Sequence, residues 1–229
     1  MINISQEDYL TAIYRNLDDA GEIKPNLLAS KLEISNAAVT DMLRKLSRDG
    51  FVDYQKYKSI KLTNEGELYA KNMLRRHRIW EVFLHQTLGM SWDKVHDEAE
   101  KLEHSSSDEI INLLEEFLEY PEVDPHGYPI PDKSGKIKKS NTVISITELN
   151  KNDSAKVIRV NDDVKNLLSY ITKIGITLGK EIKIKDVLNY DGSVLMLIDD
   201  KEVKQILAED YIEDEDEAID EDDDIDAGY

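Results

Sequence analysis

The chain has 229 residues, of which 40% are hydrophobic and 34% are charged, so it is long enough for two or three small domains with buried cores. No run approaches the roughly 20 apolar residues that a membrane-spanning helix needs, and the first residues show no basic region followed by an apolar run. We therefore expect a cytoplasmic protein without a secretory signal. The absence of cysteine excludes disulfides and zinc–thiolate centres, so a metal site would have to use nitrogen and oxygen ligands.

The negative charge is distributed unevenly along the chain. The net charge of −19 argues against nucleic-acid binding if it is taken as a property of the whole chain. However, residues 1–64 contain nine Lys or Arg and nine Asp or Glu, whereas 11 of the 14 residues from 213 to 226 are acidic. We expect residues 208–229 to form a disordered acidic tail, because they lack the apolar side chains that would offset the cost of ordering.

The N-terminal elements follow the order of a winged helix-turn-helix. Apolar residues recur at helical spacing in Glu7–Leu17, and Pro25–Leu32 begins with a proline suited to a first helical turn. A third helix is expected over Asn36–Asp49, with Gly50 placed to end it. Two short β-prone runs, Phe51–Tyr54 and Ser59–Leu62, then flank a basic tip. This order predicts a DNA-binding domain over residues 1–64.

The third of these helices is the expected recognition helix. The N-terminal residues of such a helix meet base edges in the major groove, and nearby basic residues contact phosphates. The base-facing candidates are Ser35, Asn36, Ala37, Ala38, Thr40 and Asp41, and the phosphate-facing candidates are Arg44, Lys45, Lys56 and Lys58. Asp41 fits poorly beside phosphates. The alternative is a winged helix that only packs against another protein.

The middle of the chain is expected to be helical. Helical patterns cover Asn64–Gly89, Trp92–His104 and Ser107–Leu118, and their aliphatic content suits a dimer interface. Four of the five prolines lie in Pro121–Pro131, which leads into a basic and small polar linker. We therefore predict a helical domain over residues 65–131 and a linker over residues 132–149.

The pattern changes after the linker. Ala155–Val160, Ile182–Leu188 and Gly192–Ile198 are typical of strands, and Val164–Ile174 is typical of a helix. We expect a small β-rich barrel over residues 150–207. The fold class is thus mainly α with a small β component.

One helix face concentrates metal-ligand side chains. His96, Glu100, Glu103 and His104 fall within an arc of about 100° on a helix, and His77 and Glu81 form a second pair four residues apart. Facing helices can combine such sets into a metal site. A solvated charged face is the alternative. A metallohydrolase could use the same ligands, but the sequence has neither an HExxH motif nor a nucleophile motif, so we expect a regulator rather than an enzyme.

Longer motifs carry a family resemblance. Arg75–Glu81 (RRHRIWE), Lys94–His104 (KVHDEAEKLEH), Asp124–Pro131 (DPHGYPIP) and the head Glu7–Leu10 (EDYL) resemble the diphtheria-toxin-repressor family of metalloregulators. The resemblance covers roughly residues 5–131 and extends more loosely over residues 150–207, which are similar to the family's SH3-like barrel. It implies a homodimeric repressor that binds operator DNA when its metal sites are filled.

The resemblance also implies a set of ligands. The main regulatory site would use Asp8, Glu100, Glu103 and His104, and a neighbouring site would use His77, Glu81 and His96. In some longer members, residues matching Asp124 and His126 join the neighbouring site together with an acidic residue of the barrel, here Asp163 or Asp162.

Two of these positions indicate the metal. Iron-type members have methionine and cysteine where this chain has Asp8 and Glu100, whereas manganese-type members have carboxylates at both. Because carboxylates suit Mn(II) and sulfur suits later metals, Mn(II) is the expected effector, and Fe(II) is the alternative.

Two other positions depart from the pattern of manganese-type members. Asp124 replaces a cysteine of several such members, which favours hard ions further. Thr11 lacks the carboxylate that short, barrel-free members have near Asp8, so their two-metal arrangement need not transfer.

Overall fold

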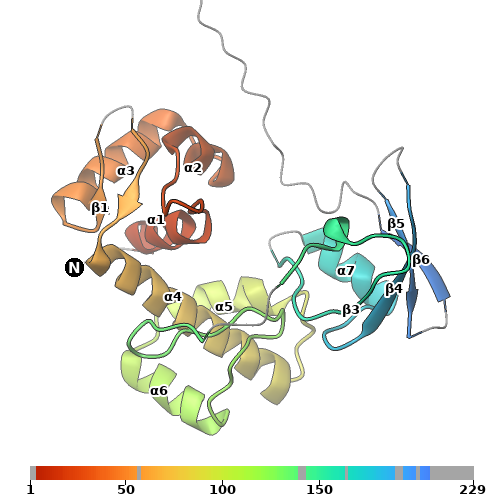
Figure 1. The fold of residues 1–229 in the computed structure, drawn as a ribbon. Helices are drawn as coiled ribbons and strands as arrows, with labels where there is room; N and C mark the ends of the chain where they lie inside the picture. Colours follow the sequence, from red (N-terminus) through yellow and green to blue (C-terminus); the bar gives the residue numbers. More distant parts are fainter. Residues whose placement is uncertain are drawn as a thin grey trace, which may run out of the picture. The chain divides into compact units, whose positions relative to one another are not determined.

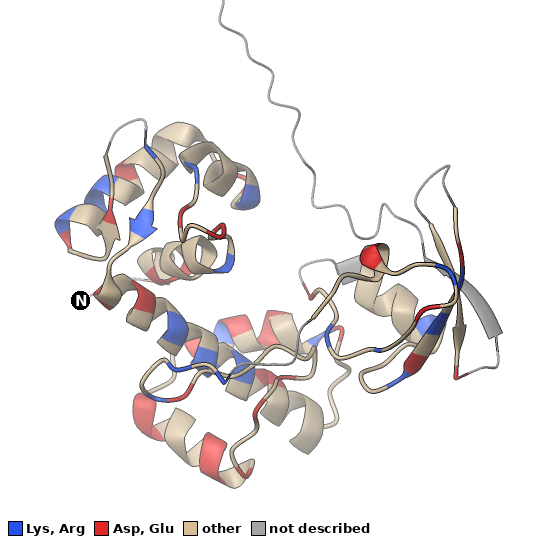
Figure 2. Cartoon of the chain, in the orientation of Figure 1, with Lys and Arg blue, Asp and Glu red and all other residues tan. Residues whose placement is uncertain are grey.

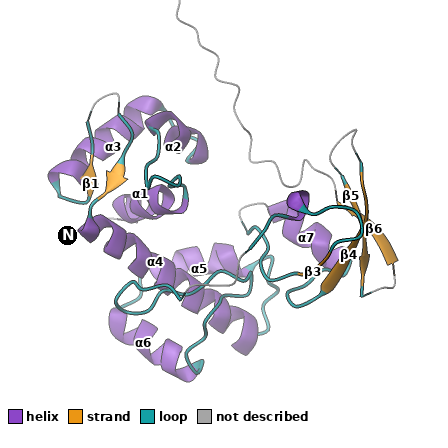
Figure 3. Ribbon diagram, in the orientation of Figure 1, coloured by secondary structure: helices purple, strands orange, loops and turns teal. Residues whose placement is uncertain are grey.

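The computed structural model describes residues 4–55, 58–138, 143–162, 165–188, 193–199 and 202–206. They divide into two units, one formed by residues 1–143 with 158–170 and the other by residues 144–157 with 171–229. Figure 3 shows that the first unit is helical apart from a short two-stranded wing, whereas the longer strands gather in the second unit. Among the described residues, no helix is both long and apolar enough to cross a bilayer.

The winged helix-turn-helix consists of α1 (Ile4–Arg15), α2 (Pro25–Lys31), α3 (Asn36–Arg48) and the antiparallel pair β1 (Val52–Asp53) and β2 (Lys61–Leu62) (Figure 1). The side chain of Ser35 begins α3 by accepting a hydrogen bond from the backbone N–H of Ala38. Buried residues of α1, α2 and α3 form one core with the wing. This core holds α3 so that its opposite face is exposed.

The helical part continues with α4 (Asn64–Val82), the π-helical turn η1 (Phe83–Thr87), α5 (Val95–Glu103) and α6 (Asp108–Phe117). The predicted helix Asn64–Gly89 is therefore α-helical only as far as Val82. Gly66, in the first turn of α4, allows the helix to approach the wing closely, because a Cβ there would lie 2.0 Å from the carbonyl oxygen of Phe51. α4 thus joins the DNA-binding part to the helical part.

The second unit contains a four-stranded antiparallel sheet in the order β3 (Ser154–Lys156), β4 (Glu181–Val187), β5 (Val194–Ile198) and β6 (Glu202–Ile206). Alternate residues of β4 and β5 are buried, as expected for a sheet with one face on a core. A 3-10 turn, η2 (Ile146–Glu148), precedes the sheet, and α7 (Lys165–Lys173) lies between β3 and β4 in sequence.

Several sequence predictions differ from this structure. The strand expected over Ala155–Val160 ends at Lys156. Val157 still exchanges backbone hydrogen bonds with Gly179 and Lys180, but Val160 donates its backbone hydrogen bond to the carbonyl oxygen of His126 and not to a strand. Strand β6 was not predicted. Lys56, Asp163 and the tail 208–229 lie outside the described residues, and the predicted domain boundaries stay predictions.

Candidate metal centres and DNA-binding surface

Among the described residues of the first unit, metal-ligand side chains meet in three groups. Within each group, one ligand atom per residue lies within 4.8 Å of the others. Asp8, Glu103 and His104 form one group, which we call the first cluster. The other two groups share Glu81, and we call their union the second cluster: His77, Glu81, His96, His126 and Asp162.

The first cluster joins α1 to the end of α5. Nε2 of His104 lies 3.1 Å from Oδ1 of Asp8 and 3.4 Å from Oε1 of Glu103. Burial raises the pKa of the Asp8 carboxyl, and the nearby carboxylates of Glu103, Glu100 and Glu7 raise it further, while His104 lowers it. The crowding of carboxylates around one imidazole favours a cation at this point.

Two residues that were not predicted as site residues orient the first cluster, namely Glu7 and Tyr69. Nδ1 of His104 lies 2.7 Å from Oε2 of Glu7, and the hydroxyl of Tyr69 donates a 2.6 Å hydrogen bond to Oε1 of the same carboxylate. Because a carboxylate can only accept, Nδ1 carries the proton and Nε2 is left to face Asp8. A carboxylate in this position is the usual partner of a metal-binding histidine. The motif Glu7-Asp8 contained a signal for Glu7, but no spacing pointed to Tyr69.

Glu100 contacts the second cluster instead of the first. Its Oε1 lies 3.4 Å from Nε2 of His96, and this hydrogen bond lowers the pKa of the Glu100 carboxyl. The predicted role of Glu100 as a ligand of the main site therefore stays a prediction.

Glu81 is the centre of the second cluster and is fully buried. Its Oε1 lies 3.1 Å from Nε2 of His77, 3.4 Å from Nδ1 of His96 and 3.6 Å from Nδ1 of His126. Oδ2 of Asp162 lies 3.7 Å from Nδ1 of His96 and 3.9 Å from Nδ1 of His126. Asp162, one of the two carboxylates considered from the sequence, thus lies at the cluster, whereas Asp163 is outside the described residues.

Charge balance within the second cluster comes from the histidines. Burial opposes protonation of His77, but Glu81 and Glu103 outweigh it and raise its pKa to about 9. Burial likewise opposes protonation of His96, and Glu100, Glu81 and Asp162 raise its pKa to about 10. Burial also acts to raise the pKa of Glu81, but the neighbouring histidines lower it well below its usual range. A cation that binds here must compete with these protons.

Buried atoms without hydrogen-bond partners show that the second cluster fits a cation. His126 is fully buried, and its Nε2 lies 2.8 Å from the carbonyl oxygen of Trp92, to which it must donate. Its Nδ1 faces the cluster and would offer a lone pair in the neutral imidazole, and neither this atom nor Oε2 of Glu81 has a hydrogen-bond partner among the described residues. Buried polar atoms are rarely left unpaired, so both atoms are suited to bind a divalent ion.

Asp124 lies beside the second cluster but outside its ligand groups. Its Oδ1 accepts hydrogen bonds from the backbone N–H groups of His126 and Tyr128, and its Oδ2 lies 3.4 Å from Nε of Arg78. Burial and the nearby Glu81 raise its pKa to about 6, while Arg78 acts in the opposite direction. Through these contacts Asp124 stabilises the turn that carries His126. Its predicted role as a ligand stays a prediction.

The predicted base-facing residues lie on the outer side of α3. Residues 35–38 and Asp41 are exposed and Thr40 is half-buried, as a surface that enters a groove requires. Asp41 forms a 3.2 Å ion pair with Arg44, which reduces its charge on this face. Figure 2 shows basic and acidic residues interspersed over α3 and the wing, in agreement with the balanced charge of residues 1–64.

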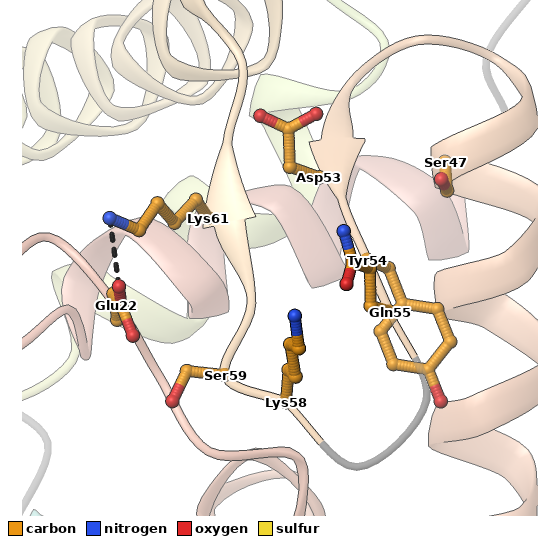
Figure 4. A pocket seen from close by; sticks show the side chains of 8 residues that line it. All are labelled: Glu22, Ser47, Asp53, Tyr54, Gln55, Lys58, Ser59 and Lys61. Carbon is orange, nitrogen blue, oxygen red and sulfur yellow. Dashed lines mark ion pairs between the residues drawn. The ribbon is translucent and has the colours of Figure 1, made fainter.

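A polar pocket of about 410 Å³ opens beside the wing (Figure 4). Lys61 forms a 2.7 Å ion pair with Glu22, whereas Lys58 projects into the pocket. The pocket thus belongs to the wing surface that we expect to face phosphates. Its lining residues are Glu22, Ser47, Asp53, Tyr54, Gln55, Lys58, Ser59 and Lys61.

Comparison with known proteins identifies the family. Residues 1–60 match the iron dependent repressor N-terminal DNA-binding domain, residues 63–132 match its metal binding and dimerisation domain, and residues 144–209 match the FeoA domain. A diphtheria toxin repressor of Corynebacterium glutamicum is 31% identical over 210 residues, which cover 85% of this chain and 91% of that protein. The chain belongs to the diphtheria-toxin-repressor family. The resemblance inferred from the motifs is therefore confirmed, and so is the fold class.

Manganese regulators are also similar to this member of the diphtheria-toxin-repressor family. A solved structure of a manganese-dependent transcriptional repressor in complex with manganese has 31% identity and a TM-score of 0.79, and the match covers 88% of this chain and 93% of that one. The transcriptional regulator MntR of Oceanobacillus iheyensis is 27% identical over 152 residues, which cover 66% of this chain and 97% of that protein.

Proposed function

We propose that this chain is a homodimeric repressor that binds operator DNA when Mn(II) occupies its two clusters. The observation that carries the proposal is the first cluster, in which Asp8 of the DNA-binding part meets Glu103 and His104 of the helical part. The sequence relatives and solved structures named above support the regulatory role.

The donor atoms favour Mn(II) among the divalent metals. Both clusters offer only carboxylate oxygens and imidazole nitrogens, because the chain contains no cysteine and has Asp8 at the head of the first cluster. Hard oxygen donors suit Mn(II), although Mn(II) is the weakest binder in the Irving–Williams order. Selectivity would therefore rest on geometry and on the number of oxygen ligands. Fe(II), which prefers similar donors, is the second candidate.

The mechanism follows from the position of the first cluster. A bound cation supplies positive charge that neutralises the carboxylates gathered there. Asp8 then holds α1 against the end of α5, and the recognition helix α3, which packs on the same core as α1, is held with it. Without that charge, repulsion between the carboxylates of Asp8 and Glu103 favours other orientations. By linkage, DNA must raise the affinity for metal by the same factor by which metal raises the affinity for DNA.

The homodimer is supported by an exposed apolar face on α6. Ile110, Leu113 and Phe117 recur at helical spacing and are 44%, 55% and 63% exposed. This face lies in the segment that matches a metal binding and dimerisation domain. Two copies would place two recognition helices at a spacing set by the DNA repeat.

DNA binding by the Glu103→Gln variant, measured with and without Mn(II), tests the role of the first cluster. We expect this variant to lose Mn(II)-dependent DNA binding, because Glu103 contacts both His104 and His77. Glu98→Gln, on the same helix and outside both clusters, is the matched control. Unchanged Mn(II) dependence in Glu103→Gln would overturn the proposal.

A further inference from the structure

We propose that three residues that are not ligands, Gly127, Tyr128 and Arg159, position the segment 158–162, here called the strap, so that Asp162 can complete the second cluster. The inference rests on the proposed function, because it concerns how a ligand of the second cluster is delivered. The strap contacts the turn that carries His126 and Gly127, and both segments belong to the first unit.

Gly127 sets how closely the strap can approach. Its φ of +92° favours glycine, and a Cβ added there would lie 2.0 Å from the carbonyl oxygen of Ile158 and 2.9 Å from Cα of Arg159. Both contacts are with backbone, which cannot be relieved by turning a side chain. Any other residue at position 127 would therefore push the strap away from the turn.

Hydrogen bonds and a cation–π contact hold the strap once it is close. The backbone N–H of Val160 donates a 2.9 Å hydrogen bond to the carbonyl oxygen of His126. The guanidinium carbon of Arg159 lies 4.9 Å from the ring centroid of Tyr128, and that of Arg78 lies 5.3 Å from the same centroid. A guanidinium within about 6 Å of an aromatic ring is attracted to it. Tyr128 thus connects the strap to α4.

The consequence is seen at Asp162. This residue is 8% exposed, and its carboxylate reaches His96 and His126 only because the strap lies against the turn. Docking of the strap and cation binding by the second cluster must then favour each other, since each makes the other less costly. The first cluster contains no strap residue and should be independent of this docking.

Gly127→Ala tests the inference. We expect the backbone amide of Val160 to lose protection from hydrogen exchange in metal-free protein, and Mn(II) affinity at the second cluster to fall about tenfold or more, with first-cluster affinity unchanged. Gly175→Ala is the matched control, because Gly175 has a φ of +85° and no atom within 4 Å of an added Cβ. Equal effects of the two substitutions, or normal protection of Val160 in Gly127→Ala, would overturn the inference.

Two further variants separate this inference from the proposed function. Arg159→Ala removes the contact with Tyr128 without a steric clash, so it should weaken protection of Val160 less than Gly127→Ala does. Asp162→Asn should keep the strap protected but lose affinity at the second cluster. If Asp162→Asn binds Mn(II) normally while Gly127→Ala still exposes Val160, the metal role of Asp162 fails and the docking role of Gly127 stands. Full protection of Val160 in both Gly127→Ala and Arg159→Ala would refute the docking role itself.

Discussion

His77 and Glu103 join the two clusters through a hydrogen bond of 2.6 Å between Nδ1 and Oε2. The other nitrogen of His77 lies 3.1 Å from Glu81 in the second cluster, while the other oxygen of Glu103 lies 3.4 Å from His104 in the first. A continuous chain of imidazoles and carboxylates therefore runs from Asp8 to Asp162. Neighbouring hydrogen bonds of such a network strengthen one another in a low-dielectric interior, so a residue shared by both clusters supports both.

The bridging position of His77 predicts that its removal affects both clusters. We expect His77→Gln to lower Mn(II) affinity at both, by about tenfold or more at the first, where His77 supports Glu103 without being a ligand. Asp8→Asn should affect the first cluster alone and Asp162→Asn the second alone. Calorimetric titration of Mn(II) into each variant distinguishes these patterns. A His77→Gln protein with an unaltered first cluster would show that the bridge carries no coupling.

The hard oxygen donors of the first cluster predict the effect of Asp8→Met. Replacing a carboxylate with a thioether should weaken activation by Mn(II) and shift preference towards later metals. DNA binding measured by fluorescence anisotropy with Mn(II) and with Zn(II) in parallel gives both responses. Unchanged Mn(II)-dependent affinity in Asp8→Met would count against this site.

The contact of Glu7 with His104 predicts a positioning role. Glu7→Gln can still accept one hydrogen bond, but it removes the negative charge that fixes the proton on Nδ1 of His104, so we expect first-cluster affinity to fall about tenfold. Tyr69→Phe should have a smaller effect, because it removes only a donor to Glu7. Second-cluster affinity is the internal control in the same titration. Equal losses at both clusters would point to general misfolding instead.

The exposed face of α6 predicts how the dimer is broken. Phe117→Glu combined with Leu113→Glu should give a monomer in analytical ultracentrifugation, because charges cannot be buried without partners. Glu116→Lys, at an exposed position of the same helix, should remain dimeric. Persistence of the dimer in the double variant would place the interface elsewhere.

Helical periodicity was sufficient to predict much of the fold. The apolar spacing in the first 64 residues predicted α1 and α3, because these helices bury one face each, and the initial proline of Pro25–Leu32 predicted α2. β6 was not predicted, because the strand has only five residues and they are mixed in polarity. The family resemblance, confirmed by the comparisons, supplied what local patterns could not, namely the meeting of Asp8 with residues almost one hundred positions away.

Only some ligands of the second cluster could be predicted from sequence patterns. His77, Glu81 and His96 stand at helical spacings that indicated a metal site, and the structure brings them together. Asp162 reaches them through the strap, whose docking depends on one backbone hydrogen bond and on the missing side chain of Gly127. Such contacts leave no periodic signal, so spacing alone could not place Asp162 beside the histidines.

The most direct test of the account is metal-dependent binding to selected DNA. Duplexes would be enriched from a random library in two parallel selections, one with Mn(II) and one with chelator, and then titrated at fixed salt with Mn(II), Fe(II), Zn(II) or chelator. We predict that specific sequences emerge only with a divalent metal, that Mn(II) gives the tightest binding, and that chelator abolishes it. Sequences that emerge with chelator and are bound equally well with and without metal would contradict the account.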